Sequence, residues 1–342
     1  MPSPLLDVAT RVPRVQIMYD FVTRAEEAFL VKHINQVGGD HTQGHKNWGW
    51  KELNGRRSMA WGGTILPNSH ALVPAPFPKF MDGDWPDLVD RIAQTGVYDA
   101  WTDNATGTGR ERGPNHCLVN EYLPAQGILP HTDGPAYVAC TTTLSLASHT
   151  VLSLRSNPAA AERVVVDKID IFLPPRSLVV LTDELYSTWL HGIQPLATSP
   201  AESLTRCANW DQWWTYLEER GPELGTEGPG TVDDEEIFHR GDDAGQGRSE
   251  RDRAFEELKH GLKQLDLLSP SSPGADDDGV DDPPVVDWVK RVGDARRRIE
   301  VEGWARSKRV SLTCRRARGK VRDLGGLLSK VTRGGSGANS KK

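Results

Sequence analysis

Two histidines and an aspartate are the residues of this chain whose types and spacing point most directly to chemistry. His131 and Asp133 are two positions apart, so on a β-strand both side chains lie on the same face. His191 lies 58 residues after Asp133 and follows another strand-like run that would bring it beside the first pair. Two imidazoles and one carboxylate on one face of a ferrous ion leave three coordination positions open, as non-haem iron oxygenases require. We therefore predict that these three residues are metal ligands and form the catalytic centre.

A second set of residues fits a keto-acid co-substrate with a distal carboxylate. A guanidinium binds a carboxylate through two parallel hydrogen bonds, and Arg309 and Arg315 share one face of the strand-like run RVSLTCRRA. Because six residues of strand span about 20 Å, the two arginines cannot bind one carboxylate. We assign Arg309 to the distal carboxylate and place Arg315 nearer the metal. Asn120 and Tyr122 share a face of another run and offer an amide and a phenol to the same ligand.

Several of these residues, and some of their neighbours, also have a simpler explanation. His116 and His149 lack a partner at ligand spacing, so we interpret both as structural. Arg316 would take the place of Arg315 only if the strand were bulged. The amide and the phenol named above would otherwise satisfy buried backbone groups.

Taken in order, these motifs resemble the AlkB-type iron(II)- and 2-oxoglutarate-dependent dioxygenases. The ordered set is NxY at 120–122, HxD at 131–133, the distal His191 and RxxxxxR at 309–315. The runs most similar to the homologue-six branch of that family are NEYLPAQGILPHTDGP, TLSLASHTVLSL, LPPRSLVVLTDELY and RVSLTCRRA. The resemblance covers residues 14–193 and 305–317. It implies a double-stranded β-helix that uses Fe(II), 2-oxoglutarate and O₂ for oxidative demethylation or hydroxylation.

The elements that must position these residues are mostly short strands. Runs of alternating and β-branched residues, separated by Pro and Gly, begin near residue 115, stop after Ile193 and return once at 309–317. The predicted strands lie in HCLVNEYL, TTTLSLASHTVLSLR, RVVVDKIDIFL, SLVVLTDE and RVSLTCRRA. The expected fold class is mainly β with added helices (α+β), which agrees with the jelly-roll core that the resemblance implies.

Helices and one hairpin are expected around the strand region. Thr23 and Glu26 have the spacing of a capping box, and apolar residues on one helical face follow them. Asn54-Gly55 predicts a hairpin turn within residues 48–63. The predicted helices cover residues 24–37, 85–95, 210–219 and 251–268.

The charge distribution divides the chain into parts. Residues 218–288 hold 21 acidic and 7 basic residues, whereas residues 289–342 hold 17 basic and 4 acidic ones. Segments of one sign that are rich in Gly, Pro and Ser usually stay solvated, so we expect the acidic segment to be partly disordered. The expected parts are an N-terminal arm at 1–13, a dioxygenase domain at 14–193 and 301–317, an insertion at 194–300, and a basic tail at 318–342. Members of the family usually place the arginine strand soon after the distal histidine, so the insertion must loop out.

Length and composition restrict the class of protein. The chain has 342 residues, a formal net charge of −6 and only four cysteines, none in a CxxC pair. Neither a zinc knuckle nor a disulfide framework is indicated. No apolar run is long enough to span a membrane, and the first residues do not resemble a signal peptide. We expect an intracellular protein of the nucleus or cytoplasm, with no membrane partner and a monomer as its simplest state.

The substrate is the least determined part of the prediction. Aromatic and basic residues alternate within residues 48–63, which suits a stacked base and its phosphates. These residues are Trp48, Trp50, Trp61, Lys51, Arg56 and Arg57. Core packing remains the simpler explanation for each single tryptophan, and the basic tail would add phosphate contacts without sequence specificity. Nucleic acid, DNA or RNA, is therefore the expected partner.

Two alternatives stay open at this point. The first keeps the iron chemistry but acts on a protein side chain, as a hydroxylase or demethylase. The second is a module that binds nucleic acid or a partner protein without turnover. The complete set of predicted ligands argues against the second, because a module without turnover needs no iron site.

Overall fold

The structure, a computed structural model, describes residues 4–8, 14–37, 49–102, 109–157, 168–221 and 284–319. The chain forms two compact units. The first unit consists of Met1–Met59, Leu118–Asp133 and Ala139–Cys314. The second consists of Ala60–Cys117, Gly134–Val138 and Arg315–Lys342. All the predicted site residues except Arg315 belong to the first unit.

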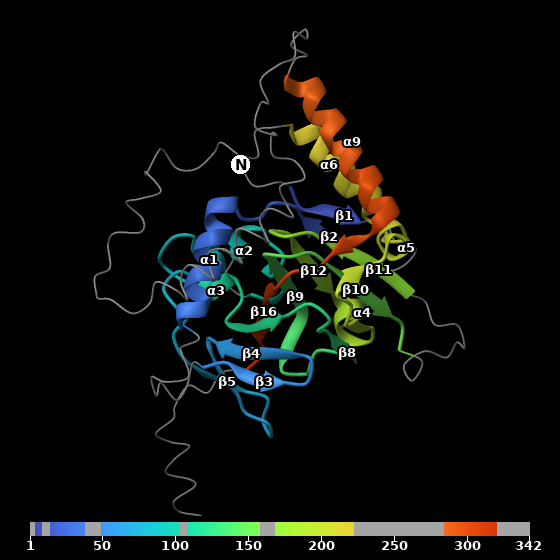
Figure 1. The fold of residues 1–342 in the computed structure, drawn as a ribbon. Coiled ribbons are helices and arrows are strands. Elements are labelled where there is room, and N and C mark those ends of the chain that lie inside the picture. Colours follow the sequence, from blue (N-terminus) through green and yellow to red (C-terminus); the bar gives the residue numbers. More distant parts are fainter. Residues whose placement is uncertain are drawn as a thin grey trace, which may run out of the picture. The chain divides into compact units, whose positions relative to one another are not determined.

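Two β-sheets form the first unit. The strands of the larger sheet are β1 (Leu6–Val8), β2 (Val15–Met18), β3 (Lys51–Leu53), β4 (Arg56–Trp61), β7 (His116–Tyr122), β9 (Tyr137–Leu146), β12 (Leu178–Thr182) and β16 (Arg309–Ala317). The strands of the smaller sheet are β8 (Ile128–His131), β10 (Thr150–Arg155), β11 (Lys168–Leu173) and β13 (Leu190–Ile193). The larger sheet has the order β1-β2-β12-β9-β16-β7-β4-β3, and the smaller has the order β11-β10-β13-β8 (Figure 1).

One hydrophobic core joins the two sheets. It takes Ile17 and Val179 from the larger sheet and Leu154, Phe172 and Ile193 from the smaller one, all less than a tenth exposed. Because successive strand residues point to opposite faces, each strand places alternate apolar side chains between the sheets. The prediction of a mainly β fold with a double-stranded β-helix core is confirmed.

Local sequence signals account for the first helix and the hairpin. In α1 (Arg24–Val37) the backbone N–H of Thr23 donates to Glu26 Oε2 at 2.8 Å, and the N–H of Glu26 donates to Thr23 Oγ1 at 3.2 Å. This is the predicted capping box, and the helix has the predicted bounds. β3 and β4 pair antiparallel about the predicted turn, where Gly55 has a φ of 78° that favours glycine.

The second unit contains short elements. They are β5 (Gly63–Ile65), β6 (Leu72–Pro74), α2 (Leu88–Gln94), the 3₁₀ turn η1 (Asp99–Trp101) and α3 (Gly109–Arg112). α2 starts later than the predicted residue 85, because the side chain of Asp87 caps the helix and accepts from the N–H of Asp90 at 3.5 Å. Trp61 is fully buried in this unit against Phe80, as the core-packing explanation expects.

The two ends of the expected insertion are helical and pack into the core of the first unit. α4 (Asp183–Ser187) lies before the expected insertion. At the ends of the insertion, α5 (Ala201–Thr205) is short, whereas α6 (Trp210–Arg220) and α9 (Pro284–Glu302) are longer and lie side by side (Figure 1). The indole N–H of Trp288 donates to the Leu217 carbonyl at 2.8 Å, and that of Trp210 donates to Glu300 at 2.9 Å. The insertion is therefore anchored at both ends by buried tryptophans.

The helices observed within residues 194–300 differ in part from the predicted ones. The helix predicted at 210–219 is confirmed as α6, but α9 was not predicted. Its buried residues Trp288, Val292, Ala295 and Ile299 recur at helical spacing. The sequence therefore carried a signal that its many charged neighbours concealed. The helix predicted at 251–268 lies outside the described residues, and the expected insertion boundaries remain a prediction.

A short strand pair joins the chain before and after these helices. β14 (Thr198–Ser199) pairs antiparallel with β15 (Trp304–Ala305), so Thr198 faces Ala305 and Ser199 faces Trp304. β14 follows the strand of His191 closely, and β15 precedes the strand of Arg309 closely. This pairing holds the end of the His191 strand close to the start of the Arg309 strand, although many residues separate the two strands in the sequence.

Two further observations concern membrane-spanning helices and cysteines. Within the described residues, no helix is both long and apolar enough to cross a membrane. The four cysteines, Cys117, Cys140, Cys207 and Cys314, are buried thiols that form no disulfide with one another. Burial raises the pKa of Cys207 to about 12, so its thiol stays protonated and acts as a small apolar group.

The packing of α9 leads to a stability test. Trp288 is 3% exposed and its indole N–H is satisfied, so Trp288→Ala removes a large buried side chain and should lower the free energy of unfolding by about 3–5 kcal/mol. Val301 on the same helix is 82% exposed, and Val301→Ala should change it by less than about 0.5 kcal/mol. Urea denaturation followed by circular dichroism measures both. Equal values for the two variants would show that α9 does not pack as described.

Candidate metal centre

The pairing of β8 with β13 brings the two predicted histidine ligands together. The strands are antiparallel, and His131 lies directly opposite His191. Side chains of directly opposed residues point to the same face of a sheet. The two imidazole centroids are accordingly 4.4 Å apart.

Two glycines allow the strands to approach this closely. A Cβ at Gly192 would lie 3.0 Å from the Ile128 carbonyl oxygen and 3.0 Å from the Pro130 nitrogen. A Cβ at Gly127 would lie 2.3 Å from the Ile193 carbonyl oxygen, closer than a real Cβ can come. Any side chain at these positions would push β8 away from β13 and separate the two imidazoles.

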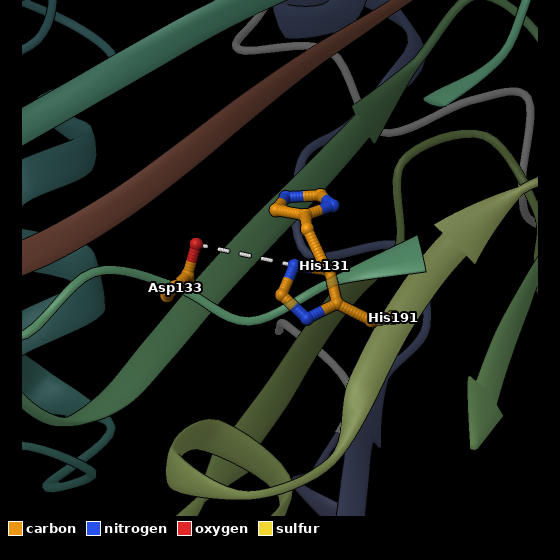
Figure 2. Close-up of side chains that lie close together, drawn as sticks. All are labelled: His131, Asp133 and His191. Carbon is orange, nitrogen blue, oxygen red and sulfur yellow. Dashed lines mark ion pairs between the residues drawn. The ribbon is translucent and has the colours of Figure 1, made fainter. Parts of the chain in front are cut away.

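Asp133 completes the cluster from outside the strand. We expected it to share a strand face with His131, but β8 ends at His131 and Asp133 lies in the segment that follows. Its carboxylate still points toward the two imidazoles, with Oδ1 3.9 Å from His191 Nε2 (Figure 2). One ligand atom from each of the three residues lies within 4.8 Å of the others.

The donor set suits a ferrous ion. Two imidazole nitrogens and one carboxylate oxygen are the ligands of a facial triad with open positions. His131 Nδ1 is 2.9 Å from the Leu129 carbonyl oxygen, and a carbonyl can only accept, so Nδ1 carries the proton. Nε2 of His131 is therefore the nitrogen left with a lone pair for a metal.

A buried guanidinium without a counter-ion lies in the same unit. Arg309 is 4% exposed, its Nη2 donates to Ser145 Oγ at 2.7 Å, and its Nε has no partner among the described residues. No carboxylate of the described residues pairs with it. Burial lowers the pKa of Arg309 to about 10, so the group remains charged at neutral pH. A buried charge of this kind is costly unless an anion compensates it.

Of the other predicted co-substrate residues, Tyr122 lies beside this cation, and Asn120 lies on the same strand as Tyr122. The guanidinium of Arg309 lies over the Tyr122 ring, 5.6 Å from its centroid. Arg56 Nε donates to Asn120 Oδ1 at 3.1 Å. Because arginine has no acceptor, the contacting atom must be the amide oxygen, and the NH₂ of Asn120 remains to donate to a ligand.

Arg315 lies in the second unit, on the continuation of the strand of Arg309. Its guanidinium lies over the Tyr137 ring at 5.3 Å, and the Tyr137 hydroxyl is 3.1 Å from His116 Nδ1. Burial, and then the charge of Arg315, lower the pKa of His116 to about 4. The placement of Arg315 nearer the metal stays a prediction. The neighbouring Arg316 donates to the Gly113 carbonyl at 2.8 Å.

Sequence reasoning missed three residues of this region. Ser145, which bonds Arg309, lies in the largely buried strand β9, where it is one of several buried hydroxyl residues, so the sequence offered no signal that singled it out. Arg56 was assigned to substrate binding alone, although it orients the Asn120 amide. Arg306 was not assigned any role.

Comparisons with known proteins place the chain in a family. No family model matches it. The chain is 31% identical over 189 residues to "Probable RNA/DNA demethylase ALKBH6" of Danio rerio, which covers 53% of this chain and 70% of that protein. The chain belongs to the AlkB family. It is therefore an oxidoreductase of the iron(II)- and 2-oxoglutarate-dependent dioxygenase class, which uses Fe(II), 2-oxoglutarate and O₂.

Two further relatives are less identical to this chain, and one of them matches it over a smaller share of its own length. The chain is 28% identical over 183 residues to "Uncharacterized protein L905" of Acanthamoeba polyphaga mimivirus, covering 52% of this chain and 72% of that one. It is 25% identical to "tRNA (carboxymethyluridine(34)-5-O)-methyltransferase ALKBH8" of Macaca fascicularis, over 53% of this chain and 24% of that one. The solved structure of OsALKBH1 matches 92% of this chain and 100% of its own with a TM-score of 0.40 and 12% identity, too loosely to add to the sequence match.

The three converging side chains can be tested by metal binding alone. His131→Ala and Asp133→Ala each remove one of three ligands, so each should weaken Mn(II) binding by more than about 100-fold, beyond the usual loss for an outer-sphere residue. The thermal midpoint of the metal-free protein should change little, because neither side chain belongs to the hydrophobic core. Titration calorimetry measures the affinity. His70→Gln, at an exposed histidine, is the control, and normal Mn(II) affinity in either ligand variant would refute the assignment.

Proposed function

We propose that this dioxygenase removes alkyl groups from nucleic acid by oxidation, with His131, Asp133 and His191 as its iron ligands. The observation that carries the proposal is the convergence of these three side chains in the unit that also holds the uncompensated Arg309. The three side chains supply a metal site with open positions, and Arg309 supplies a cation for an anionic co-substrate.

The bound cofactor provides the oxidising chemistry, and the chain provides position and charge. When bound, iron with 2-oxoglutarate and O₂ oxidises a substrate C–H bond and yields succinate and CO₂. His131 offers Nε2 because its Nδ1–H is held by the Leu129 carbonyl. Asp133 and His191 supply the other two donors, and their side chains are only 5% and 13% exposed, which limits the access of water.

Arg309 holds the distal carboxylate of 2-oxoglutarate in this proposal. Its Nε–H has no partner among the residues that the structure describes, and a fork of two parallel N–H groups matches a carboxylate. The Tyr122 phenol beside it offers a further donor. The NH₂ of Asn120, oriented by Arg56, offers a donor to another oxygen of the same keto acid.

The hairpin of β3 and β4 supports a nucleic-acid substrate. Arg57 lies over the ring of Trp50 at 4.5 Å and is held by a two-pronged ion pair with the buried Glu121, with Nε–Oε1 at 2.7 Å and Nη2–Oε2 at 2.8 Å. This contact fixes a partly exposed indole beside the exposed Lys51, which together suit a stacked base and its phosphate. The names of the relatives from Danio rerio and Macaca fascicularis also refer to nucleic acids. Trp48 and residues 320–342 of the basic tail lie outside the described residues.

The role of Arg309 gives a quantitative prediction. Arg309→Ala leaves the distal carboxylate without its partner, and the usual cost of breaking a buried pair, about 3–5 kcal/mol, corresponds to a loss of 2-oxoglutarate affinity of at least about 100-fold. Arg309→Lys should recover only part, because one ammonium cannot make the two-pronged contact. Calorimetry on the Mn(II)-loaded protein measures both.

A matched control removes a surface charge instead. Arg206, exposed and paired with Glu202 at 3.7 Å, should tolerate Arg206→Ala with no change in 2-oxoglutarate affinity. Mn(II) affinity should stay close to that of the wild type in Arg309→Ala. Unchanged 2-oxoglutarate affinity in Arg309→Ala, together with a loss in Arg315→Ala, would reverse the roles assigned to the two arginines.

The substrate class is tested by a comparison of oligonucleotides and peptides. We expect formaldehyde release from N-methylated DNA or RNA oligonucleotides and none from methylated peptides. Trp50→Ala should raise the KM for the oligonucleotide by about 5- to 100-fold, the range that the loss of one base-stacking contact predicts. Turnover of peptides alone would favour the protein side-chain alternative and refute the nucleic-acid proposal.

A further inference from the structure

Ser145 is bonded to the buried guanidinium of Arg309 from the neighbouring strand. β9, which carries Ser145, lies directly beside β16 in the larger sheet. Ser145 is fully buried, and its Oγ accepts from Arg309 Nη2 at 2.7 Å. A guanidinium donates and never accepts, so this bond uses the oxygen of the Ser145 hydroxyl and leaves its proton available. A direct contact thus joins Ser145 to the residue proposed to bind the co-substrate.

The hydroxyl proton of Ser145 has no acceptor among the residues that the structure describes. The Arg309 contact is the one side-chain hydrogen bond of Ser145 within them. The equally buried Ser177 differs, because its Oγ donates to the Pro174 carbonyl at 2.7 Å. Buried polar groups are nearly always hydrogen-bonded, and a buried donor without an acceptor destabilises the fold. The unused O–H of Ser145 therefore indicates an acceptor that comes from a bound ligand.

The backbone of Ser145 is fixed by the turn before β12. Its N–H donates to the Ser177 carbonyl at 2.9 Å, and its carbonyl accepts from the N–H of Arg176 at 2.7 Å. The buried guanidinium of Arg176 is held in turn by Asp20 at 2.7 Å and by Glu27 at 3.1 Å. The Ser145 hydroxyl is therefore in place before any ligand binds, and a donor that is already ordered costs little entropy on binding.

The Ser145 O–H and the Arg309 charge call for the same kind of ligand. Arg309 Nε–H also has no partner in the described part of the chain, so two unused donors lie on the two sides of one hydrogen bond. A carboxylate has two oxygens with several lone pairs and can accept from both donors at once. It also compensates the buried charge, which a neutral acceptor does not. The local chemistry therefore fits a carboxylate better than a neutral group.

We propose that Ser145 completes the distal-carboxylate site of the co-substrate, with its oxygen bonded to Arg309 Nη2 and its O–H donated to the carboxylate. The inference rests on the proposed role of Arg309 and adds a residue of β9, outside the NxY and RxxxxxR motifs. Because the two bonds use different parts of one hydroxyl, ligand binding leaves the bond between Ser145 and Arg309 intact. Ser145 then helps to select a keto acid with a second carboxylate over one without it.

The test compares two keto acids on full-length protein loaded with Mn(II). One is 2-oxoglutarate, and the other is 2-oxopentanoate, which has the same chain length but no distal carboxylate. Ser145→Ala should weaken 2-oxoglutarate binding by about 10- to 100-fold, the usual effect of losing one hydrogen bond to a charged group. The affinity for 2-oxopentanoate should stay the same, because that ligand offers the hydroxyl no acceptor. Titration calorimetry measures both affinities.

A rescue variant and a matched control complete the design. Ser145→Thr keeps the hydroxyl, so it should bind 2-oxoglutarate about tenfold more tightly than Ser145→Ala does. Ser177→Ala removes an equally buried serine hydroxyl that is bonded to a backbone carbonyl, and it should leave the affinity for both keto acids unchanged. If the added methyl group of threonine prevents folding, Ser145→Ala and the Ser177→Ala control decide alone.

Three results would overturn the inference. Unchanged 2-oxoglutarate affinity in Ser145→Ala would remove Ser145 from the site. Equal losses for both keto acids would assign it a structural role only. A folded Ser145→Thr that binds no better than Ser145→Ala would show that the hydroxyl is not the group that matters. Failure of the proposed function gives a different result, because wild-type protein would then fail to bind 2-oxoglutarate, or would bind it and act on no nucleic acid.

Discussion

The cross-strand pairing of His131 with His191 is the constraint on which the candidate site depends. A sheet places directly opposed residues on one face, so the register of β8 against β13 decides whether the two imidazoles meet. A slip of one residue would turn one of them to the other face. Gly127 and Gly192 allow the two strands to pair in this register, because a side chain at either position would separate them.

The second organising feature is a positive charge that no acid of the described residues compensates. Folding buries Arg309 with the Ser145 hydroxyl as its hydrogen-bond partner. A buried charge of this kind is costly unless an anion pairs with it. If 2-oxoglutarate binds as proposed, its distal carboxylate would offset this cost, which would favour an anionic co-substrate over a neutral one.

Sequence reasoning succeeded where the signal was local. The capping box of Thr23 and Glu26 gave the first helix its bounds, and the Asn54-Gly55 turn gave the hairpin, since both depend on residues within a few positions of each other. The strand of Arg309 was also predicted with its observed bounds, 309–317, because its alternation is internal to it.

Features that depend on distant partners were not predictable in this way. Asp133 lies beyond its strand because β8 ends where its pairing with β13 ends, and that limit is set by a strand some 60 residues away. α9 was missed because its charged residues dominate its composition, and its apolar stripe gains meaning only against α6. Arg306 could not be assigned, because its partners at 194 and 199 are more than 100 residues away.

The pairing of β14 with β15 explains how the arginine strand can lie close to the strand of the distal histidine although many residues separate them in the sequence. Closing a longer loop costs only about 0.6 kcal/mol for each doubling of its length, so the number of inserted residues matters little. What matters is that the two ends stay together. Burial of a tryptophan such as Trp288 or Trp210 contributes several times that amount, and the pairing of Ser199 with Trp304 fixes the register at which β16 begins. The pairing of β14 with β15 thus holds the start of β16 close to the end of β13, whatever the number of residues between them.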